Sequence, residues 1–182
     1  MNFFSLFFLL LISSSILYSE EKFIYFDGSE QRTIFLLPDY VAELNNGHSS
    51  GLRSLQKNIR PILSRGNLEI FRASDAGLKT SIKSNQYSNG VLQVFSENHS
   101  PDRYVIPVGN IIVQFDGSIK NISDANSWAS RNGSRILKHL FGNHYLLESA
   151  PGIPSIETAN RFRTLESVLS ATPDLIKPFS LR

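Results

Sequence analysis

Hydrophobic residues dominate the first nineteen positions, and short alternating runs of apolar and polar residues follow. Residues 1–19 contain no Lys, Arg, Asp or Glu, and residues 6–12 form an uninterrupted apolar run. Such a run is too short for a bilayer, which needs about 20 residues, and is typical of a secretory signal peptide. We therefore expect cleavage near Ser19 and a secreted or periplasmic mature chain that is not membrane-bound. An uncleaved membrane anchor is the alternative.

The mature chain opens with the pattern of a β-hairpin. Residues 23–26 and 33–37 are rich in aromatic and β-branched side chains, and Asp27-Gly28-Ser29 between them favours a turn. Pro38-Asp39 is expected to end the second run, because proline cannot donate a backbone hydrogen bond. A new strand is expected over residues 40–44.

A repeated order of elements follows the hairpin. The first pass is expected to begin with a strand at 40–44 and a helix with Leu52, Leu55 and Ile59 on one face. Strands at 62–63 and 68–72, a second helix begun by Ser74 or Asp75, and a strand at 91–95 are expected to follow. The second pass is expected to contain a strand at 111–115, a helix capped by Ser123, strands at 135–140 and 144–148, a helix with Pro154 at its first position, and a strand at 168–171 ended by Pro173.

Both passes have the order β-α-β-β-α-β, which is that of the ferredoxin-like fold, an antiparallel sheet with two helices on one face. We therefore predict an α+β chain with a signal peptide at 1–19, a β-rich N-terminal domain at 20–106 and a ferredoxin-like domain at 107–182. The N-terminal domain is either a degenerate second copy or a coincidence of pattern.

Composition excludes several classes of function. The chain has 18 basic and 16 acidic side chains, a net charge of +2 and no cysteine. The small net charge, without a block of like charge, argues against nucleic acid as a partner. The absence of cysteine excludes disulfides, zinc–thiolate sites, iron–sulfur clusters and cysteine catalysis. We find no glycine-rich phosphate loop, and we expect no cofactor and no small-molecule ligand.

One segment matches a catalytic motif. Gly47-His48-Ser49-Ser50-Gly51 fits the G-x-S-x-G nucleophile elbow of hydrolases. The preceding Asn45-Asn46 loosens the connection that such an elbow needs, and the expected strands are short and alternating. We therefore favour a turn in which Ser49 or Ser50 caps a helix. A small secreted serine hydrolase built on Ser49 is the alternative.

Two further features bear on chemistry and packing. His139 and His144 flank an expected hairpin turn and could face each other, but two histidines without carboxylates make a weak metal site, so no metal is expected. Trp128 stands at helical spacing from Ala125 and Ala129, which indicates a place in the core.

Short motifs between Asn110 and Arg182 resemble the propeptide domain of secreted subtilisin-like serine proteases. The motifs are residues 111–115, Trp128-Ala129 with Asn132-Gly133, residues 145–148, residues 157–162 and residues 168–174. Their order and spacing agree with that family, so residues 107–182 are interpreted as a subtilisin-propeptide-like domain.

The resemblance implies a binding protein without catalytic residues of its own. In the family, the sheet covers two helices of the protease and the C-terminal tail lies along the substrate cleft. The resemblance thus assigns the tail residues Phe179, Ser180, Leu181 and Arg182 to the cleft, with Arg182 in the pocket before the scissile bond. Asp174 matches a position near the interface, where it would accept hydrogen bonds from the start of a protease helix. A solvated turn residue is the alternative for Asp174.

The catalytic sequence blocks of the protease are absent from the chain. We therefore expect a stand-alone propeptide-like protein that binds a subtilisin-like serine protease as an inhibitor or folding chaperone. Besides the serine hydrolase, the other alternative is a remnant binding domain that has lost its partner.

Overall fold

The computed structural model of the chain describes residues 21–44, 52, 59–77 and 90–178. Strands contain 50% of the described residues and helices 19%. The strands are β1 (Lys22–Asp27), β2 (Glu30–Leu44), β3 (Leu63–Arg65), β4 (Leu68–Arg72), β5 (Val91–Ser96), β6 (Tyr104–Phe115), β7 (Ile136–Phe141), β8 (His144–Glu148) and β9 (Val168–Ile176). The helical elements between them are η1 (Pro101–Arg103), α2 (Ile122–Arg131) and α3 (Ile153–Arg163).

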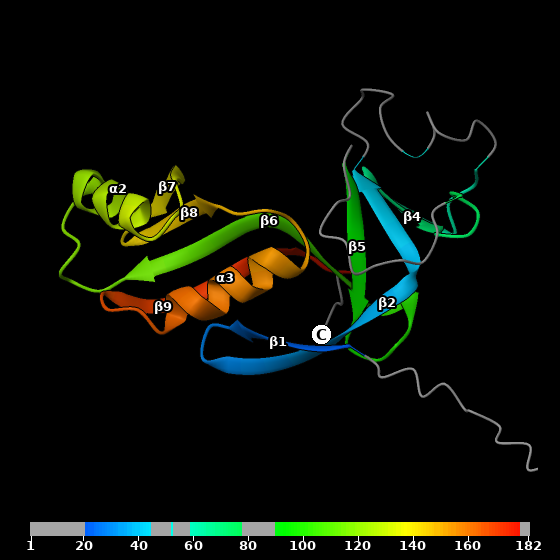
Figure 1. Ribbon diagram of the computed structural model, residues 1–182, viewed down its shortest axis with the longest axis horizontal. Coiled ribbons are helices and arrows are strands. Elements are labelled where there is room, and N and C mark those ends of the chain that lie inside the picture. The colour runs from blue at the N-terminus through cyan, green and yellow to red at the C-terminus, as the bar shows by residue number, and fades with distance from the viewer. Residues whose placement is uncertain (1–20, 45–51, 53–58, 78–89, 179–182) are drawn as a thin grey trace, which may run out of the picture.

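All nine strands belong to one sheet, with the order β3-β4-β2-β5-β6-β8-β7; β1 also pairs with β2, and β9 with β6. The long strand β6 joins the two parts of this sheet (Figure 1). Its first residues, Tyr104 and Val105, pair with β5, and its remaining length pairs with β8 and β9. We call β1–β5 the N-terminal part and β6–β9 with α2 and α3 the C-terminal part.

The predicted α+β, ferredoxin-like fold class is wrong for this chain. The protein is mainly antiparallel β, and its strands form a continuous sheet rather than two separate four-stranded units. The physical reason lies in β6, a single twelve-residue strand whose first four residues are all buried and whose later residues alternate between buried and partly buried, so that one strand belongs to both parts of the sheet. The domain boundary placed between residues 106 and 107 falls inside this strand.

The expected N-terminal hairpin is confirmed, but β2 is longer than predicted. β1 and β2 pair in register from Lys22↔Phe35 to Asp27↔Glu30. β2 then continues through Pro38 and Asp39, which were expected to end it. A register irregularity against β5 between Leu36 and Val41 accommodates the proline, because an irregular segment needs no ladder hydrogen bond from it.

The first pass differs from the prediction after β4. Residues 73–77 form turns, with Gly77 N–H donating to Ser74 O at 3.1 Å, and the rest of the helix expected from Ser74 or Asp75 lies outside the described residues. Most of the helix expected around Leu55 lies outside the described residues. Leu52 is described and is fully buried against Val41 and Phe71.

Both helices of the C-terminal part start near the expected positions, with different caps. The N-cap of α2 is Asn121 and not Ser123, because the Asn121 side chain accepts hydrogen bonds from Ser123 N and Asp124 N. Helix α3 begins at Ile153, one residue before Pro154. In place of a local side-chain cap, Gln93 Oε1 from β5 accepts a hydrogen bond from Ile153 N at 3.0 Å.

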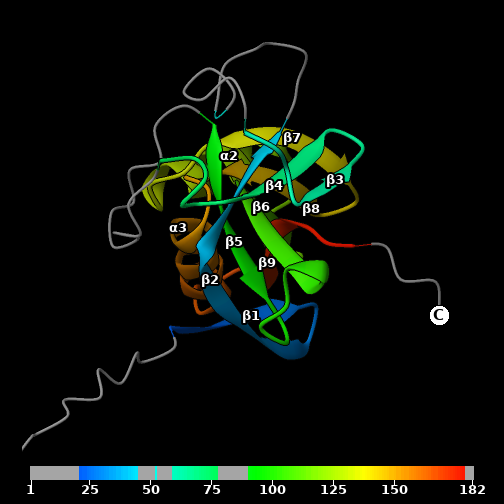
Figure 2. The same ribbon diagram turned by 90° about the vertical axis from the view of Figure 1, so that its right-hand side faces the viewer.

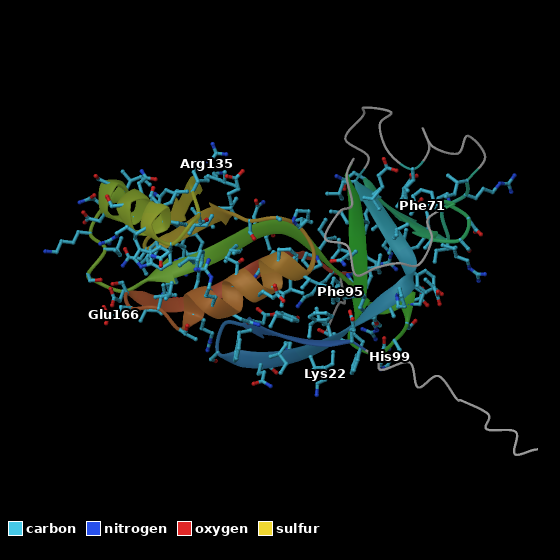
Figure 3. All side chains as sticks on the ribbon, in the orientation of Figure 1. Lys22, Phe71, Phe95, His99, Arg135 and Glu166 are labelled. Carbon is cyan, nitrogen blue, oxygen red and sulfur yellow. The ribbon has the colours of Figure 1, made fainter. Side chains whose placement is uncertain are left out.

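The largest core lies between the two helices and the C-terminal part of the sheet. Trp128 belongs to it, as its helical spacing predicts, and is 5% exposed. Its Nε1–H donates to the backbone carbonyl of Glu166, which lies near the start of β9 (Figure 3). The other buried members are Ile111, Val113, Phe115, Ile119, Ala125, Ala129, Tyr145, Leu147, Ala159, Phe162 and Ala171.

A second core fixes the β1–β2 hairpin against the C-terminal part. Its buried members are Tyr25, Ile34, Phe95, Val105 and Ile156. Phe95 lies where the two parts of the sheet meet (Figure 3). Because Ile156 comes from α3 and the other residues come from strands of both parts, this core couples the N-terminal hairpin to helix α3.

Candidate protein-binding face

The strands β9, β6, β8 and β7 lie side by side in that order, with the helices on one side of them. In β6, Ile111, Val113 and Phe115 are buried beneath the helices. Successive side chains of a strand point to opposite faces, so Ile112 and Gln114 point away from the helices. We call this second side of the four strands the open face. Figure 2 shows α3 on one side of β6 and β9 and none of the described helices on the other.

Two rows of paired residues cross the open face. The first row is Lys138, Leu146, Ile112 and Thr172, and the second row is Phe141, His144, Gln114 and Ser170. Each row takes one residue from β7, β8, β6 and β9 in turn. Leu146 and Ile112 are only partly buried, which leaves an apolar centre with polar neighbours at its sides.

Phe141 is the most exposed of the large apolar side chains of the described residues, with 66% of its surface accessible. It stacks on His144 with ring centres 4.4 Å apart, so His144 holds one side of the ring and leaves the other open. At the other end of the same row, Ser170 Oγ donates to Gln114 Oε1 at 3.3 Å. An exposed aromatic ring supported by its neighbours is typical of protein-binding surfaces.

Two further exposed leucines lie in β7 and β9, the outer two of these four strands. Leu137 in β7 and Leu169 in β9 are 42% and 60% exposed. Each is the extra residue at a register irregularity, so neither has a direct partner on the adjacent strand. Apolar side chains are therefore exposed on both edge strands of the open face.

The structure places Asp174 within β9 and not after its end. The strand was expected to stop at Pro173, but it continues to Ile176. Pro173 is tolerated because β9 is an edge strand of the described sheet. Asp174 is half-buried, and strand alternation puts it on the open face, on the same side as Thr172.

Asp174 lies opposite an irregular segment of β6. The register shifts between Pro107 and Ile111, and Gly109 within it has a φ of +101°. A Cβ at Gly109 would lie 2.9 Å from Pro151 N, so the backbone approaches too closely there for any side chain. Glycine at position 109 therefore allows the irregular backbone of β6 close to the junction between the N-terminal and C-terminal parts of the sheet.

The chain leaves the sheet through Lys177, which follows β9. Its Nζ donates to Tyr25 Oη at 2.6 Å and lies 3.4 Å from Asp27 Oδ2. Burial raises the pKa of Tyr25, against the opposing effect of the Lys177 hydrogen bond and charge. Burial lowers the pKa of Lys177, but its hydrogen bonds and charge interactions with Tyr25 and Asp27 raise it by more. The pKa of Lys177 therefore lies above its ordinary value. Lys177 is thus an ammonium donating to a neutral phenol at neutral pH.

The predicted tail residues Phe179, Ser180, Leu181 and Arg182 lie outside the described residues, as does the Gly47–Gly51 motif with Ser49. The expectation that His139 and His144 face each other is wrong. His139 pairs with Tyr145 and Phe141 with His144, because an irregularity at Leu140 shifts the register between them. Among the described residues, no group of three or more His, Asp or Glu is placed to hold a metal ion.

Sequence reasoning missed two features of this region. The sequence signal for Phe141 was its position beside the Gly142-Asn143 turn, where a hairpin end exposes its side chains. For the contact between Tyr25 and Lys177 there was no signal, because the two residues are 152 positions apart. Over the described part of the chain, neither helix is long and apolar enough to cross a membrane.

Comparison with known proteins identifies no relative. No protein-family model matches the chain, and no curated protein or solved structure matches it. The resemblance to subtilisin propeptides therefore rests on the short motifs between Asn110 and Arg182.

Proposed function

We propose that this protein is secreted or exported to the periplasm and binds a subtilisin-like serine protease, as an inhibitor or folding chaperone without catalytic activity of its own. The open face is the proposed contact surface, and the C-terminal residues after Pro178 are the proposed inhibitory segment. The observation that carries the proposal is the partly apolar open face with Phe141 exposed upon it.

The chemistry of the open face supports a protein as the partner. Its apolar centre, Ile112 and Leu146, adjoins the exposed ring of Phe141, while Lys138 and Asp174 supply charges of both signs near it. Protein interfaces commonly have an apolar centre and a polar rim. A binding site for a small molecule would instead be concave and enclose its ligand.

The position of β9 supports a role for the C-terminal segment. β9 is an edge strand, and it places Asp174 on the open face a few residues before Phe179. A segment that leaves an edge strand can add to a partner through main-chain hydrogen bonds. Contact by the open face would then bring residues 179–182 next to the same protease.

Inhibition of a subtilisin-like protease by the purified chain, begun at Glu20, tests the proposal. The substitution Phe141→Lys should weaken inhibition by about tenfold or more, because it removes an exposed aromatic anchor. The matched control is Ile122→Lys, since Ile122 is also exposed (48%) but lies in α2, on the helical side. Refolding of the mature protease with and without the chain separates a chaperone from an inhibitor.

Two outcomes would contradict the proposal. One is the absence of both inhibition and assisted refolding for every subtilisin-like protease tested. The other is equal weakening by Phe141→Lys and Ile122→Lys, which would remove the open face from the contact. Labelling of the chain by a fluorophosphonate at Ser49 would favour the serine hydrolase instead.

A further inference from the structure

The Lys177 side chain contacts two residues of the β1–β2 hairpin. Its Nζ contacts both Tyr25 and Asp27, and it also lies 4.9 Å from the centre of the Tyr25 ring. Only 32% of the Lys177 side chain is exposed. A long, flexible side chain loses much rotational freedom in such an arrangement, so the contacts must offset that loss.

The partner of Lys177 is itself rigid. Tyr25 is fully buried in the core that joins β1, β2 and β5 to α3. The β1–β2 hairpin is held to α3 by two side-chain hydrogen bonds, from Asn160 Nδ2 to Ile24 O in β1 at 2.7 Å and from Arg163 to Gly28 O in the turn at 2.8 Å. The ring of Phe26 also packs beneath the Arg163 guanidinium, 4.0 Å from the ring centre. Lys177 therefore donates its hydrogen bond to a residue whose position is fixed by the core.

We propose that Lys177 is a positioning residue, anchored by Tyr25 and Asp27, that sets the direction in which the C-terminal segment leaves the sheet towards the bound protease. This inference rests on the proposed function. It gives the β1–β2 hairpin a role in binding although the hairpin does not form part of the open face. Pro178 adds to the effect, because its ring fixes its own φ and restricts Lys177 to extended geometry.

The physical advantage of such an anchor is preorganisation. A segment that leaves the sheet in one direction loses less conformational freedom when it binds than a segment free to point anywhere. Removing the anchor should therefore weaken inhibition without changing any residue that touches the protease. The loss should be roughly three- to tenfold, as expected for the ordering of one or two side chains.

The test combines Lys177→Met with deletion of residues 179–182. In the full chain, Lys177→Met and Tyr25→Phe should each weaken inhibition by that factor. Tyr25→Phe removes the hydroxyl that Lys177 contacts, which also donates to Glu97 Oε1 at 3.5 Å, so Lys177→Met is the more specific of the two changes. In the shortened chain, Lys177→Met should have no further effect, because the segment it positions is gone. Lys22→Met is the matched control, since Lys22 is an exposed lysine on the same strand as Tyr25 and points away from the sheet (Figure 3).

A measurement on the free chain separates this inference from the proposed function. Backbone amides at the end of β9, from Asp174 to Ile176, should exchange hydrogen faster in Lys177→Met than in the Lys22→Met control. Inhibition that is unchanged by Lys177→Met, or weakened equally in the full and shortened chains, would overturn the positioning role alone. A chain that binds no subtilisin-like protease would overturn the proposed function, and faster exchange in Lys177→Met would then still support the anchor itself.

Discussion

Trp128 offers the most direct test of how the helices pack on the sheet. Its ring makes edge contacts with Phe115 and Phe162, with ring centres 4.9 and 5.2 Å away. Its Nε1–H donates to Glu166 O at 3.3 Å, and only 5% of the residue is exposed. Replacing a buried tryptophan by alanine typically costs about 3–5 kcal/mol. Each of the two aromatic contacts is worth about 0.5–1.5 kcal/mol beyond the burial of the ring. We therefore expect the cost of Trp128→Ala to lie towards the upper end of this range.

The magnitude can be checked by urea and thermal unfolding followed by far-UV circular dichroism. For a chain of this size, a loss of about 3–5 kcal/mol corresponds to a fall in Tm of roughly 6–20 °C. Trp128→Phe keeps an aromatic ring but loses the hydrogen bond to Glu166, so it should cost less, about 1–2 kcal/mol. Because Trp128 is the only tryptophan, fluorescence of the unmodified chain reports on the same core.

The control is Ile122→Ala, a change in the same helix at a residue that is 48% exposed. A surface substitution of this kind is expected to change stability by no more than about 0.5 kcal/mol. A cost below about 1 kcal/mol for Trp128→Ala, or one equal to that of the control, would refute the packing of α2 on the sheet through Trp128.

Three further predictions concern the joint between the two parts. Gly152→Ala should destabilise the chain by about 1–3 kcal/mol, because Gly152 has a φ of +78° and a Cβ there would overlap Gln93 Oε1; urea unfolding should show partial recovery when Gln93→Ala is added. A fragment of residues 107–182 retains every member of the core around the two helices and should unfold cooperatively, at a lower Tm than the full chain because it lacks the β1–β2 hairpin; a flat trace would indicate a single shared core. The raised pKa values of Tyr25 and Lys177 mean that the folded chain holds these protons more tightly than the unfolded chain, so Tm should fall as the pH rises above about 10; Tyr25→Phe should reduce that fall, and an identical pH profile would contradict the contact.

Local patterns were sufficient to predict much of the secondary structure. The turn residues between β1 and β2, the apolar run of β4 and the helical spacing around Trp128 all led to elements that the structure contains. These features depend on neighbours a few residues away, where turn chemistry and the spacing of apolar residues determine the conformation. In α3, Ile156, Ala159 and Phe162 stand three residues apart and are all buried, which is the same local relation between spacing and burial.

The continuation of β2 and β6 could not be predicted in this way. Pro38 marks a position without a hydrogen-bond donor, but whether a strand ends or becomes irregular there depends on the strand beside it. Similarly, alternation in β6 shows which residues face a core, and it does not show that β5, β8 and β9 share the strand. The fold class was wrong for this reason.

The sequence by itself determined the positions of most strands and of both helices of the C-terminal part, and the place of Trp128 in the core. The export signal stays a prediction. Only the tertiary structure decided which strands are neighbours, which face of the C-terminal part is open, and that Lys177 contacts Tyr25. The physical reason is that burial is read from the period of apolar residues along the chain. Pairing between distant segments instead depends on the packing of the whole molecule, in which a hairpin at residues 22–44 and a lysine at residue 177 meet beside α3.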